Sequence, residues 1–274
     1  MSGPAHNPSA VQDVAPLRVP TTSDGPKPAT DPGHVAVEAP LTIDVRDVGT
    51  YTILCSPTDA TALAVGFLFT EGIIDGPADI GVLQRCEDDP SVVRVQLTGP
   101  SRTESAGRNL LVVSACGLCG SESIDERLAA LPACESSLVV PASTLRVAAE
   151  AMRKRQQTFQ TTGGTHAAAV FNRVGGIVAF AEDIGRHNAL DKVIGSCLLA
   201  GRALQGHGVA LSGRVSFEMI AKCARAGLEI VAAVSAPTSL AVEAAQRANI
   251  TLCAFVRGER ATVYAVPHRI ATDP

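Results

Sequence analysis

Residues 209–256 read VALSGRVSFEMIAKCARAGLEIVAAVSAPTSLAVEAAQRANITLCAFV and contain three short apolar runs separated by two longer segments of helical periodicity. The runs predict strands at 209–212, 228–234 and 250–256. The segments between them predict helices that span 217–226 and 240–248. Strands that alternate with helices favour a parallel or mixed sheet that carries helices on its faces. The fold class is therefore α/β, a mixed sheet with flanking helices.

The rest of the chain extends this sheet and adds a smaller α+β part before it. Residues 1–33 are rich in Pro, Ser, Thr, Asp and Gly and lack apolar periodicity, which predicts a disordered tail. Residues 34–131 form the predicted N-terminal part, and residues 132–270 form the predicted main domain. The further predicted strands are 41–45, 51–55, 92–97, 167–171, 177–182 and 261–266, and the further predicted helices are 57–71, 145–157 and 189–199.

The composition argues against several classes of protein. The chain has 274 residues, of which 46% are hydrophobic and 18% are charged, so it can bury a sizeable core. A net charge of −4 argues against a non-specific nucleic-acid binder, and no apolar run is long enough to span a membrane. The sequence begins without the charged and apolar segments of a secretory signal, so we expect a cytoplasmic location. The six cysteines outside the CxxC pair are isolated and are expected to be reduced and buried.

Two thiols, Cys116 and Cys119, share the short glycine-containing segment SACGLCGS at residues 114–121. The capping-box sequence SIDE at 123–126 follows, so the pair precedes a helix start, whose positive dipole end favours an anion. A thiol in such a setting titrates at roughly 3.5–7.5 instead of about 8.5, and the thiolate is the reactive form. The segment therefore indicates a reactive dithiol. A zinc site would need about four ligands and the chain has no second such pair, while a thioredoxin-type centre and a purely structural pair remain alternatives.

Polar turns follow the three strands of residues 209–256. In such sheets, ligands bind beyond the carboxyl ends of the strands, where helix starts offer N–H groups to phosphates. The first turn offers Arg214 as a fork for phosphate and Ser216 as a helix N-cap. Turns at 235–238 and 255–260 complete the set. Each turn alone is typical of a capped helix or a solvated loop, but three that converge on one sheet edge favour a nucleotide pocket.

A further polar cluster is the segment DIGRHN, which begins at Asp183 between a predicted strand and a predicted helix. Asp183, Arg186 and His187 fit either a helix-capping turn with a surface ion pair or a clamp for a substrate or phosphate. The segment TTGGTH, which ends at His166, offers small donors and one histidine before a strand. A lone histidine in such a place is packed more often than catalytic, so His166 is not assigned as a base. The roles of these residues stay open at this point.

Several segments, in the right order from about residue 35 to residue 268, resemble the FdhD family of formate dehydrogenase accessory sulfurtransferases. The predicted tail lies outside the similarity. The segments that carry it are VEAPL at 37–41, AVGFLFTEGII at 64–74, CGLC at 116–119, TGGTH at 162–166, EDIGRHNA at 182–189, SGRVSFEM at 212–219 and SAPT at 235–238.

The resemblance implies a sulfur carrier in which a cysteine desulfurase passes a persulfide to Cys116, with Cys119 as the companion thiol. The sulfur would then move to the molybdenum of the bis(molybdopterin guanine dinucleotide) cofactor, a bound substrate destined for apo-formate dehydrogenase. It further implies a cytidine-deaminase-like C-terminal domain and a homodimer. The residues expected to bind the cofactor are Phe255, Val256, Arg257, Gly258, Glu259 and Arg260, together with Arg214 and Ser216 at the same sheet edge.

The deaminase kinship does not imply deamination. Zinc deaminases carry His-x-Glu and Pro-Cys-x-x-Cys motifs, whereas here Ala115 precedes Cys116 and Val35-Ala36 follows His34. No resident metal is therefore expected. Two other functions remain open for the same chain: a dithiol–disulfide oxidoreductase, and a non-catalytic chaperone that binds the cofactor and the dehydrogenase.

Overall fold

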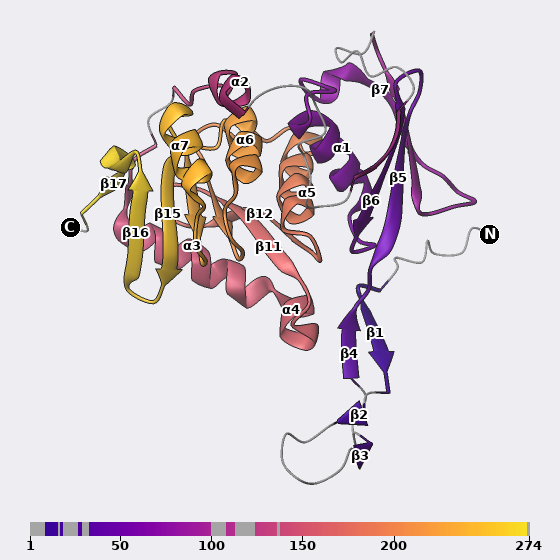
Figure 1. Ribbon diagram of the computed structural model, residues 1–274, viewed down its shortest axis with the longest axis horizontal. Helices are drawn as coiled ribbons and strands as arrows, with labels where there is room; N and C mark the ends of the chain where they lie inside the picture. Colours follow the sequence, from indigo (N-terminus) through magenta and orange to yellow (C-terminus); the bar gives the residue numbers. More distant parts are fainter. Residues whose placement is uncertain are drawn as a thin grey trace.

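The computed structural model describes residues 9–15, 33–99, 124–135 and 138–272, and the backbone alone of residues 17–18, 27–28 and 108–112. As the sequence predicts, the architecture is mixed α/β, with two main sheets flanked by helices. Figure 1 shows the larger sheet in the C-terminal half and the smaller sheet in the N-terminal half. Helices α1 (Ala60–Thr70) and α5 (Arg186–Leu199) lie between the two sheets.

The larger sheet has the strand order β12-β11-β13-β14-β15-β16. Its neighbours β13, β14 and β15 are parallel, and the outer pairings are antiparallel. The predicted strands are therefore confirmed, each within two residues at either end. Their bounds are β11 His166–Phe171, β12 Ile177–Asp183, β13 Gly208–Leu211, β14 Ile230–Ala233, β15 Thr251–Arg257 and β16 Arg260–Ala265.

Helices cover both faces of this sheet. Helices α5, α6 (Phe217–Ala226) and α7 (Ser239–Arg247) lie on one face, and α3 (Ala142–Arg155) lies on the other (Figure 1). Helix α6 begins and ends at the predicted residues. Helix α3 ends two residues earlier than predicted, because the backbone leaves the helical region at Gln156 before the short helix α4 (Gln157–Thr162) begins.

The smaller sheet has the order β7-β8-β5-β6-β9. Its hairpin and its third strand were predicted, but β7 and β9 were not. The β7 sequence IGVLQR has a glycine in its second position and no regular alternation, so pairing with β8 stabilises a segment whose own pattern is weak. The bounds are β5 Ala39–Val45, β6 Gly49–Cys55, β7 Ile80–Arg85, β8 Val92–Leu97 and β9 Arg108–Val112.

The disorder expected for residues 1–33 does not hold for residues 11–14. This segment, β1 (Val11–Val14), pairs antiparallel with β4 (Gly33–Ala36), so the backbone hydrogen bonds come from a distant partner that composition cannot reveal. The division between residues 131 and 132 remains a prediction. Smaller elements are β2 Leu17–Arg18, β3 Lys27–Pro28, α2 Ile124–Ala129, β10 Val140–Pro141, β17 Ile270–Ala271 and the 3₁₀ turns Pro77–Asp79 and Pro267–Arg269.

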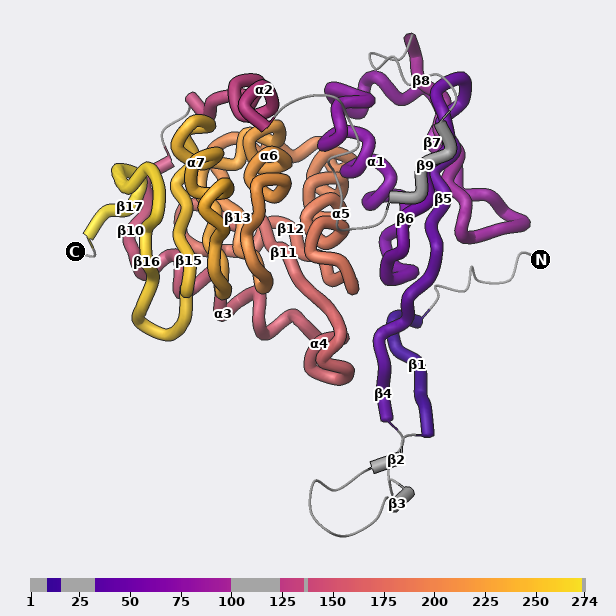
Figure 2. The backbone as a smooth tube through the Cα atoms, viewed as in Figure 1, coloured from indigo at the N-terminus to yellow at the C-terminus, as the bar shows by residue number. Residues whose placement is uncertain are grey.

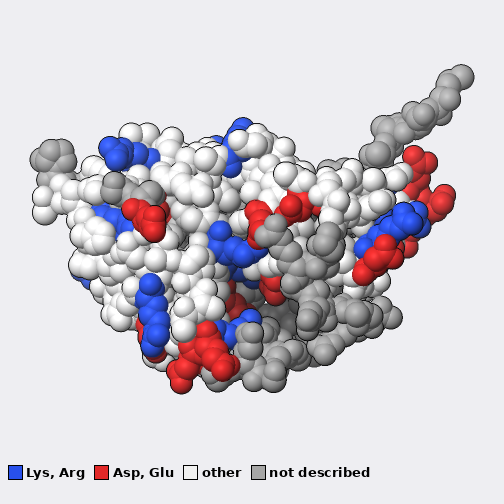
Figure 3. Space-filling view, turned by 90° about the horizontal axis from the view of Figure 1, so that it is seen from above, with Lys and Arg blue, Asp and Glu red and all other residues white. Residues whose placement is uncertain are grey.

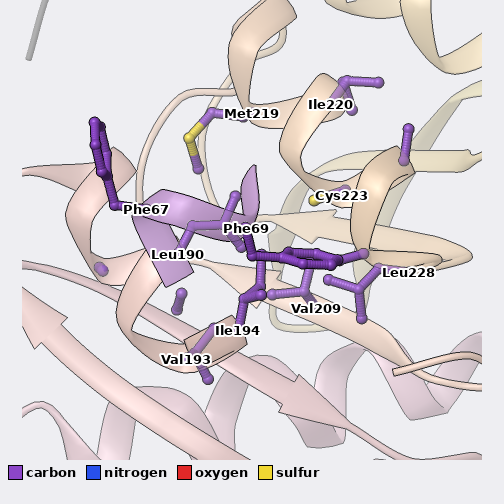
Figure 4. Close-up of a cluster of buried hydrophobic side chains, with 14 of the residues drawn as sticks. Phe67, Phe69, Leu190, Val193, Ile194, Val209, Met219, Ile220, Cys223 and Leu228 are labelled. Atoms are coloured by element: carbon purple, nitrogen blue, oxygen red, sulfur yellow. The ribbon is translucent and has the colours of Figure 1, made fainter. Parts of the chain in front are cut away.

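One apolar core joins the two halves of the chain. Helix α1 has nine buried residues out of eleven, as expected for a helix that is apolar on all sides. Figure 4 shows Phe69 of α1 close to Leu190 and Ile194 of α5 and to Cys223 of α6. Phe67 points away from this group, and its ring centroid lies 5.4 Å from that of Tyr51 in β6. Figure 2 shows α5 between α1 and α6. The same continuous cluster includes side chains from both main sheets.

Two glycines allow α1 and α5 to approach closely. A Cβ atom added at Gly66 would lie 1.8 Å from the carbonyl oxygen of Asp191, and one added at Gly195 would lie 2.0 Å from that of Ala62. Real Cβ atoms do not come this close to backbone atoms, so neither helix could carry a side chain at these positions without moving.

A buried ion cluster lies beside the C-terminal end of α1. The Lys222 ammonium lies 3.0 Å from Asp191 Oδ2 and 3.0 Å from Glu71 Oε1, and it donates to Thr70 Oγ1 at 2.8 Å. Burial alone would lower the pKa of Lys222, but the carboxylates of Asp191 and Glu71 raise it to about 12. The cluster ties the C-terminal end of α1 to α5 and α6.

The isolated cysteines are mostly buried, as predicted. Cys55, Cys134, Cys197, Cys223 and Cys253 are buried and free, whereas Cys86 is only half-buried. Burial raises the pKa of Cys253 to about 12, and it also raises the pKa of Cys134 to about 11. These thiols are therefore protonated at neutral pH.

Surface charge is mixed where the structure describes it. On the face shown in Figure 3, the blue basic side chains form small groups, several of them beside red acidic ones, and no broad positive stripe crosses the coloured part of that face. Among the helices described, none is long and apolar enough to cross a membrane.

Candidate functional site

A cavity of about 600 Å³ lies at the carboxyl ends of the parallel strands, between the sheet and helix α3. Ser212, Val234 and Val256 line it directly after or at the ends of β13, β14 and β15. This is the edge at which the sequence predicts that three polar turns converge, and parallel sheets bind ligands at this place. The three turns meet at this edge, since Val215 N–H donates to Ala236 and Phe255 N–H donates to Ser235. Among the described residues that line the cavity, however, there is none from 235–238, and neither Arg214 nor Ser216 is included.

The opposite wall of the cavity comes from α3, which sequence reasoning did not include. Arg146, Glu150 and Arg153 of this helix line the cavity, and Arg146 Nη1 lies 3.4 Å from Glu150 Oε1. Their spacing of four and three residues places them on one helix face. That spacing was the available signal, but it could not show that the charged face lies over a sheet edge.

The glycine loop before β11 forms a third side of the cavity. Glu182 positions it, because its carboxylate accepts hydrogen bonds from the N–H groups of Thr158 and Phe159 at 3.0 and 2.9 Å, and from Thr165 Oγ1 at 2.9 Å. Gly163 ends α4 at a φ of 67°, a conformation that favours glycine. The segment TTGGTH is thus the end of a short helix that delivers His166 to the cavity wall.

The predicted cofactor turn is divided between two strands and two cavities. Phe255, Val256 and Arg257 belong to β15, while Gly258 and Glu259 make the turn and Arg260 begins β16. Val256, Arg257 and Gly258 line the large cavity, and Arg257 Nε donates to the Val234 carbonyl at 3.0 Å.

Glu259 and Arg260 line a smaller cavity of about 400 Å³ instead, together with Val256 and Gly258. The exposed Phe255 ring pairs with the Tyr264 ring, with centroids 6.4 Å apart. The structure therefore does not gather all six predicted residues at one cavity.

The DIGRHN segment leads into α5 with no side-chain hydrogen bond at the N-cap Gly185, and its ion pair is fully buried and not at the surface. Asp183 Oδ2 lies 2.7 Å from the Lys192 ammonium, and both side chains have no exposed area. Asp183 also accepts from the N–H groups of Ser56 at 3.0 Å and Gly185 at 2.8 Å, and from Asn188 Nδ2 at 2.9 Å. Lys192 was not predicted although it lies on the next element, because a buried ion pair leaves no local signal, and Ser56 was not predicted because it is distant from Asp183 in the sequence.

His187 follows on the first turn of α5. Its Nε2 lies 3.0 Å from Glu218 Oε2 and 3.4 Å from Ser216 Oγ, so it joins the start of α5 to the start of α6. Ser216 precedes α6 as predicted, although its hydroxyl makes no hydrogen bond that caps the helix. Arg214 is exposed in the same turn.

His166 lies between the cavity and these helix starts. Burial and the nearby charges of Arg186, His187 and Arg214 lower its pKa, against an opposing effect of Asp183. The half-buried ring is therefore neutral at pH 7, and whether it acts as a base stays open.

Cys116, Cys119 and the capping-box residue Ser123 lie outside the described residues. The last described residue before them is Val112, which ends β9 and pairs with Ile53 of β6. Strand β6 ends at Cys55, and Ser56 contacts Asp183. Val112 therefore lies opposite a residue that is three strand positions before Ser56, or about 10 Å along the strand direction.

Comparison with known proteins gives one consistent result. The sequence profile of the FdhD/NarQ family matches residues 36–271. The chain belongs to this family. A relative from Anaeromyxobacter dehalogenans (strain 2CP-C), named sulfur carrier protein FdhD, is 44% identical over 256 residues, which cover 86% of this chain and 88% of the relative.

Other FdhD/NarQ relatives extend the match. A sulfur carrier protein FdhD from Bordetella petrii is 38% identical over 276 residues, covering 99% of this chain and 98% of the relative. A crystal structure from Desulfotalea psychrophila, described as a formate dehydrogenase accessory protein, superposes with a TM-score of 0.74 at 27% identity. It covers 94% of this chain and 99% of that protein. The likeness supports the fold described above.

Proposed function

We propose that this chain is a sulfur carrier that supports the maturation of formate dehydrogenase. The observation that carries the proposal is membership of the FdhD/NarQ family across residues 36–271, with relatives named sulfur carrier protein FdhD. The CGLC pair at Cys116 and Cys119 supplies the thiols that such a role requires.

The first step is loading of the carrier. The Cys116 thiolate attacks the outer sulfur of a cysteine persulfide on a desulfurase, forms a new S–S bond and releases the desulfurase thiolate. The outer sulfur keeps its oxidation state, so no external reductant is needed. The product is a persulfide on Cys116.

The second step is release of the sulfur. Cys119 attacks the inner sulfur of the loaded persulfide and forms a Cys116–Cys119 disulfide, and the outer sulfur leaves as hydrosulfide toward the molybdenum of the substrate. The two electrons gained by that sulfur come from the dithiol, which a cellular thiol reductant must then restore. Alternatively, the Cys119 thiolate attacks the outer sulfur, so that the persulfide moves to Cys119 and the Cys116 thiolate is released without a change in oxidation state.

The substrate in this proposal is the molybdenum cofactor with two guanine dinucleotides. Support comes from the cavity at the carboxyl ends of β13–β15, whose volume suits a nucleotide and whose walls carry Arg146, Arg153 and Arg257. The cytidine-deaminase-like nature of the C-terminal domain, a homodimeric state and a cytoplasmic location belong to the same proposal.

Intact-mass measurement tests this function. After incubation with cysteine desulfurase and cysteine, the chain is expected to gain one sulfur atom, and Cys116→Ala is expected to gain none. A loss of two hydrogens by the wild type, together with no gain of sulfur by a Cys119→Ala chain that cannot form the disulfide of the second step, would instead favour a dithiol–disulfide oxidoreductase. Activation of formate dehydrogenase by a chain that lacks both cysteines would favour a non-catalytic chaperone, and either outcome would contradict the carrier.

A further inference from the structure

Four basic side chains meet beside the cavity, where β12 leads into α5 and β13 leads into α6. Arg186, His187 and Arg214 all act on the charge of His166. A Cβ atom added at Gly213 would lie 3.2 Å from His166 Nδ1 and 3.7 Å from Arg186 Cβ, so these two side chains flank the same glycine. We refer to His166, Arg186, His187 and Arg214 as the basic cluster.

The acidic groups near the basic cluster already have partners. Asp183 is paired with the buried Lys192, and Glu218 lies 3.0 Å from His187. Among the described residues, neither Arg186 nor Arg214 makes an ion pair or a side-chain hydrogen bond. Glu182 lies nearby as well, but its carboxylate accepts hydrogen bonds from Thr158, Phe159 and Thr165 and from neither guanidinium.

Arg186 carries a second indication that a group is missing. Its Nε atom is buried and has no hydrogen-bond partner within the described part of the chain. Native proteins rarely leave such a donor unpaired, so an acceptor from outside these residues is expected. An acceptor that meets two guanidinium groups at once is best supplied by an oxyanion with several oxygens, such as phosphate.

The basic cluster is continuous with the cavity. His166 lines the cavity, and so does Ser212, which precedes Gly213. A ligand whose larger part occupies the cavity could therefore place an anionic end on the basic cluster. In addition, α5 starts at Arg186 of the basic cluster, and no side chain caps its first N–H groups at the N-cap.

We propose that the basic cluster is a binding site for the phosphate group of a phosphorylated ligand held in the adjoining cavity. The inference rests on the proposed function for the identity of that ligand, but its phosphate chemistry comes from the basic cluster alone. It adds Arg186, at the start of α5, to the phosphate fork that the sequence predicts at Arg214 before α6. Arg186 and Arg214 act as the phosphate-binding groups.

Isothermal titration calorimetry with inorganic pyrophosphate, GDP and guanosine tests this site. Arg186→Gln and Arg214→Gln are each expected to weaken pyrophosphate and GDP binding by about tenfold or more, the effect of losing one charge-assisted contact. Guanosine binding should stay unchanged. Arg173→Gln removes an exposed guanidinium outside the cavity and serves as the matched control. Because Arg214 is also exposed, its variant should fold even if the Arg186 variant does not.

The outcomes separate this inference from the proposed function. Equal pyrophosphate binding by the wild type and both variants would overturn the inference, as would absence of pyrophosphate binding by the wild type. In either case, a gain of sulfur measured by intact mass would still support the proposed function. Pyrophosphate binding that depends on Arg186 and Arg214, without any GDP binding, would uphold the site and contradict the nucleotide part of the proposed function.

Discussion

Replacing Gly195 with alanine tests the contact that joins the two halves of the molecule. The new Cβ atom would meet the Ala62 carbonyl oxygen at 2.0 Å and the Gly66 nitrogen at 2.7 Å, both of them backbone atoms of α1. A normal non-bonded contact lies near 3.5 Å, so the two helices would have to separate by roughly 1.5 Å. No flexible side chain is available to absorb this change.

The expected loss of stability follows from two opposing effects. Alanine favours the helix over glycine by about 1 kcal/mol. Overpacking a rigid core costs about 1–3 kcal/mol, and occasionally more. Separation would also loosen the packing of Phe69 against α5 and the Lys222–Asp191 ion pair, which lie along the same contact. We therefore expect a net loss of about 1–2 kcal/mol in the free energy of unfolding, the upper part of the difference between these two effects.

Urea unfolding followed by far-UV circular dichroism measures this loss. Gly76→Ala is the control, because its φ of 178° suits any residue and a Cβ atom there would have no neighbour within 4 Å. Adding Gly66→Ala to Gly195→Ala should cost less than the sum of the single changes, since one separation of the helices relieves both clashes. A Gly195→Ala protein as stable as the wild type would refute the close approach of α1 and α5.

Three further predictions concern the buried charges, the buried thiols and the cavity. Lys192→Met should lower the free energy of unfolding by about 3–5 kcal/mol, because it leaves the Asp183 carboxylate buried without its cation. Adding Asp183→Asn to this variant should recover part of the loss. Thermal denaturation that shows no recovery in the double variant would contradict the ion pair. Burial raises the pKa of Cys55 and Cys253 to about 12 from 9.0, so their stabilising contribution is complete below pH 9 and falls by about 1.4 kcal/mol per pH unit for each thiol above it. Urea midpoints measured from pH 8 to pH 10.5 should therefore decrease, and alkylation of Cys253 in the native protein at pH 8 would contradict its burial. Arg257→Ala should weaken guanosine binding more than pyrophosphate binding in calorimetry, because this side chain lines the cavity and does not belong to the basic cluster. A larger loss of pyrophosphate binding than of guanosine binding would show that Arg257 does not contact the nucleoside.

Much of the fold is predictable from local patterns, and the exceptions share a physical cause. Helix α6 was predicted to its last residue because its apolar face has helical spacing and Gly227 ends it in the left-handed conformation. Strand β7 was missed because its partner β8 supplies the order that its own residues lack. Strand β1 was missed for the same reason, since it depends on β4, which lies about twenty residues away along the chain.

The site was predictable only in part. Topology alone brings the turns after β13, β14 and β15 to one edge, and the structure confirms that convergence. The wall that α3 provides was not predictable, because a helix on the opposite face is placed by tertiary packing. The partnership of Asp183 with Lys192 was also missed, since a buried ion pair leaves no local sequence signal.

The close contact between α1 and α5 has a consequence for protein engineering. A backbone deliberately severed between Val112 and Ile124 would yield two polypeptides that still share the apolar cluster, the Gly66–Gly195 crossing and the Lys222 ammonium. Such fragments should reassemble without a covalent link. Each could then be produced separately, so that isotopes or non-natural amino acids enter one fragment while the other remains unlabelled.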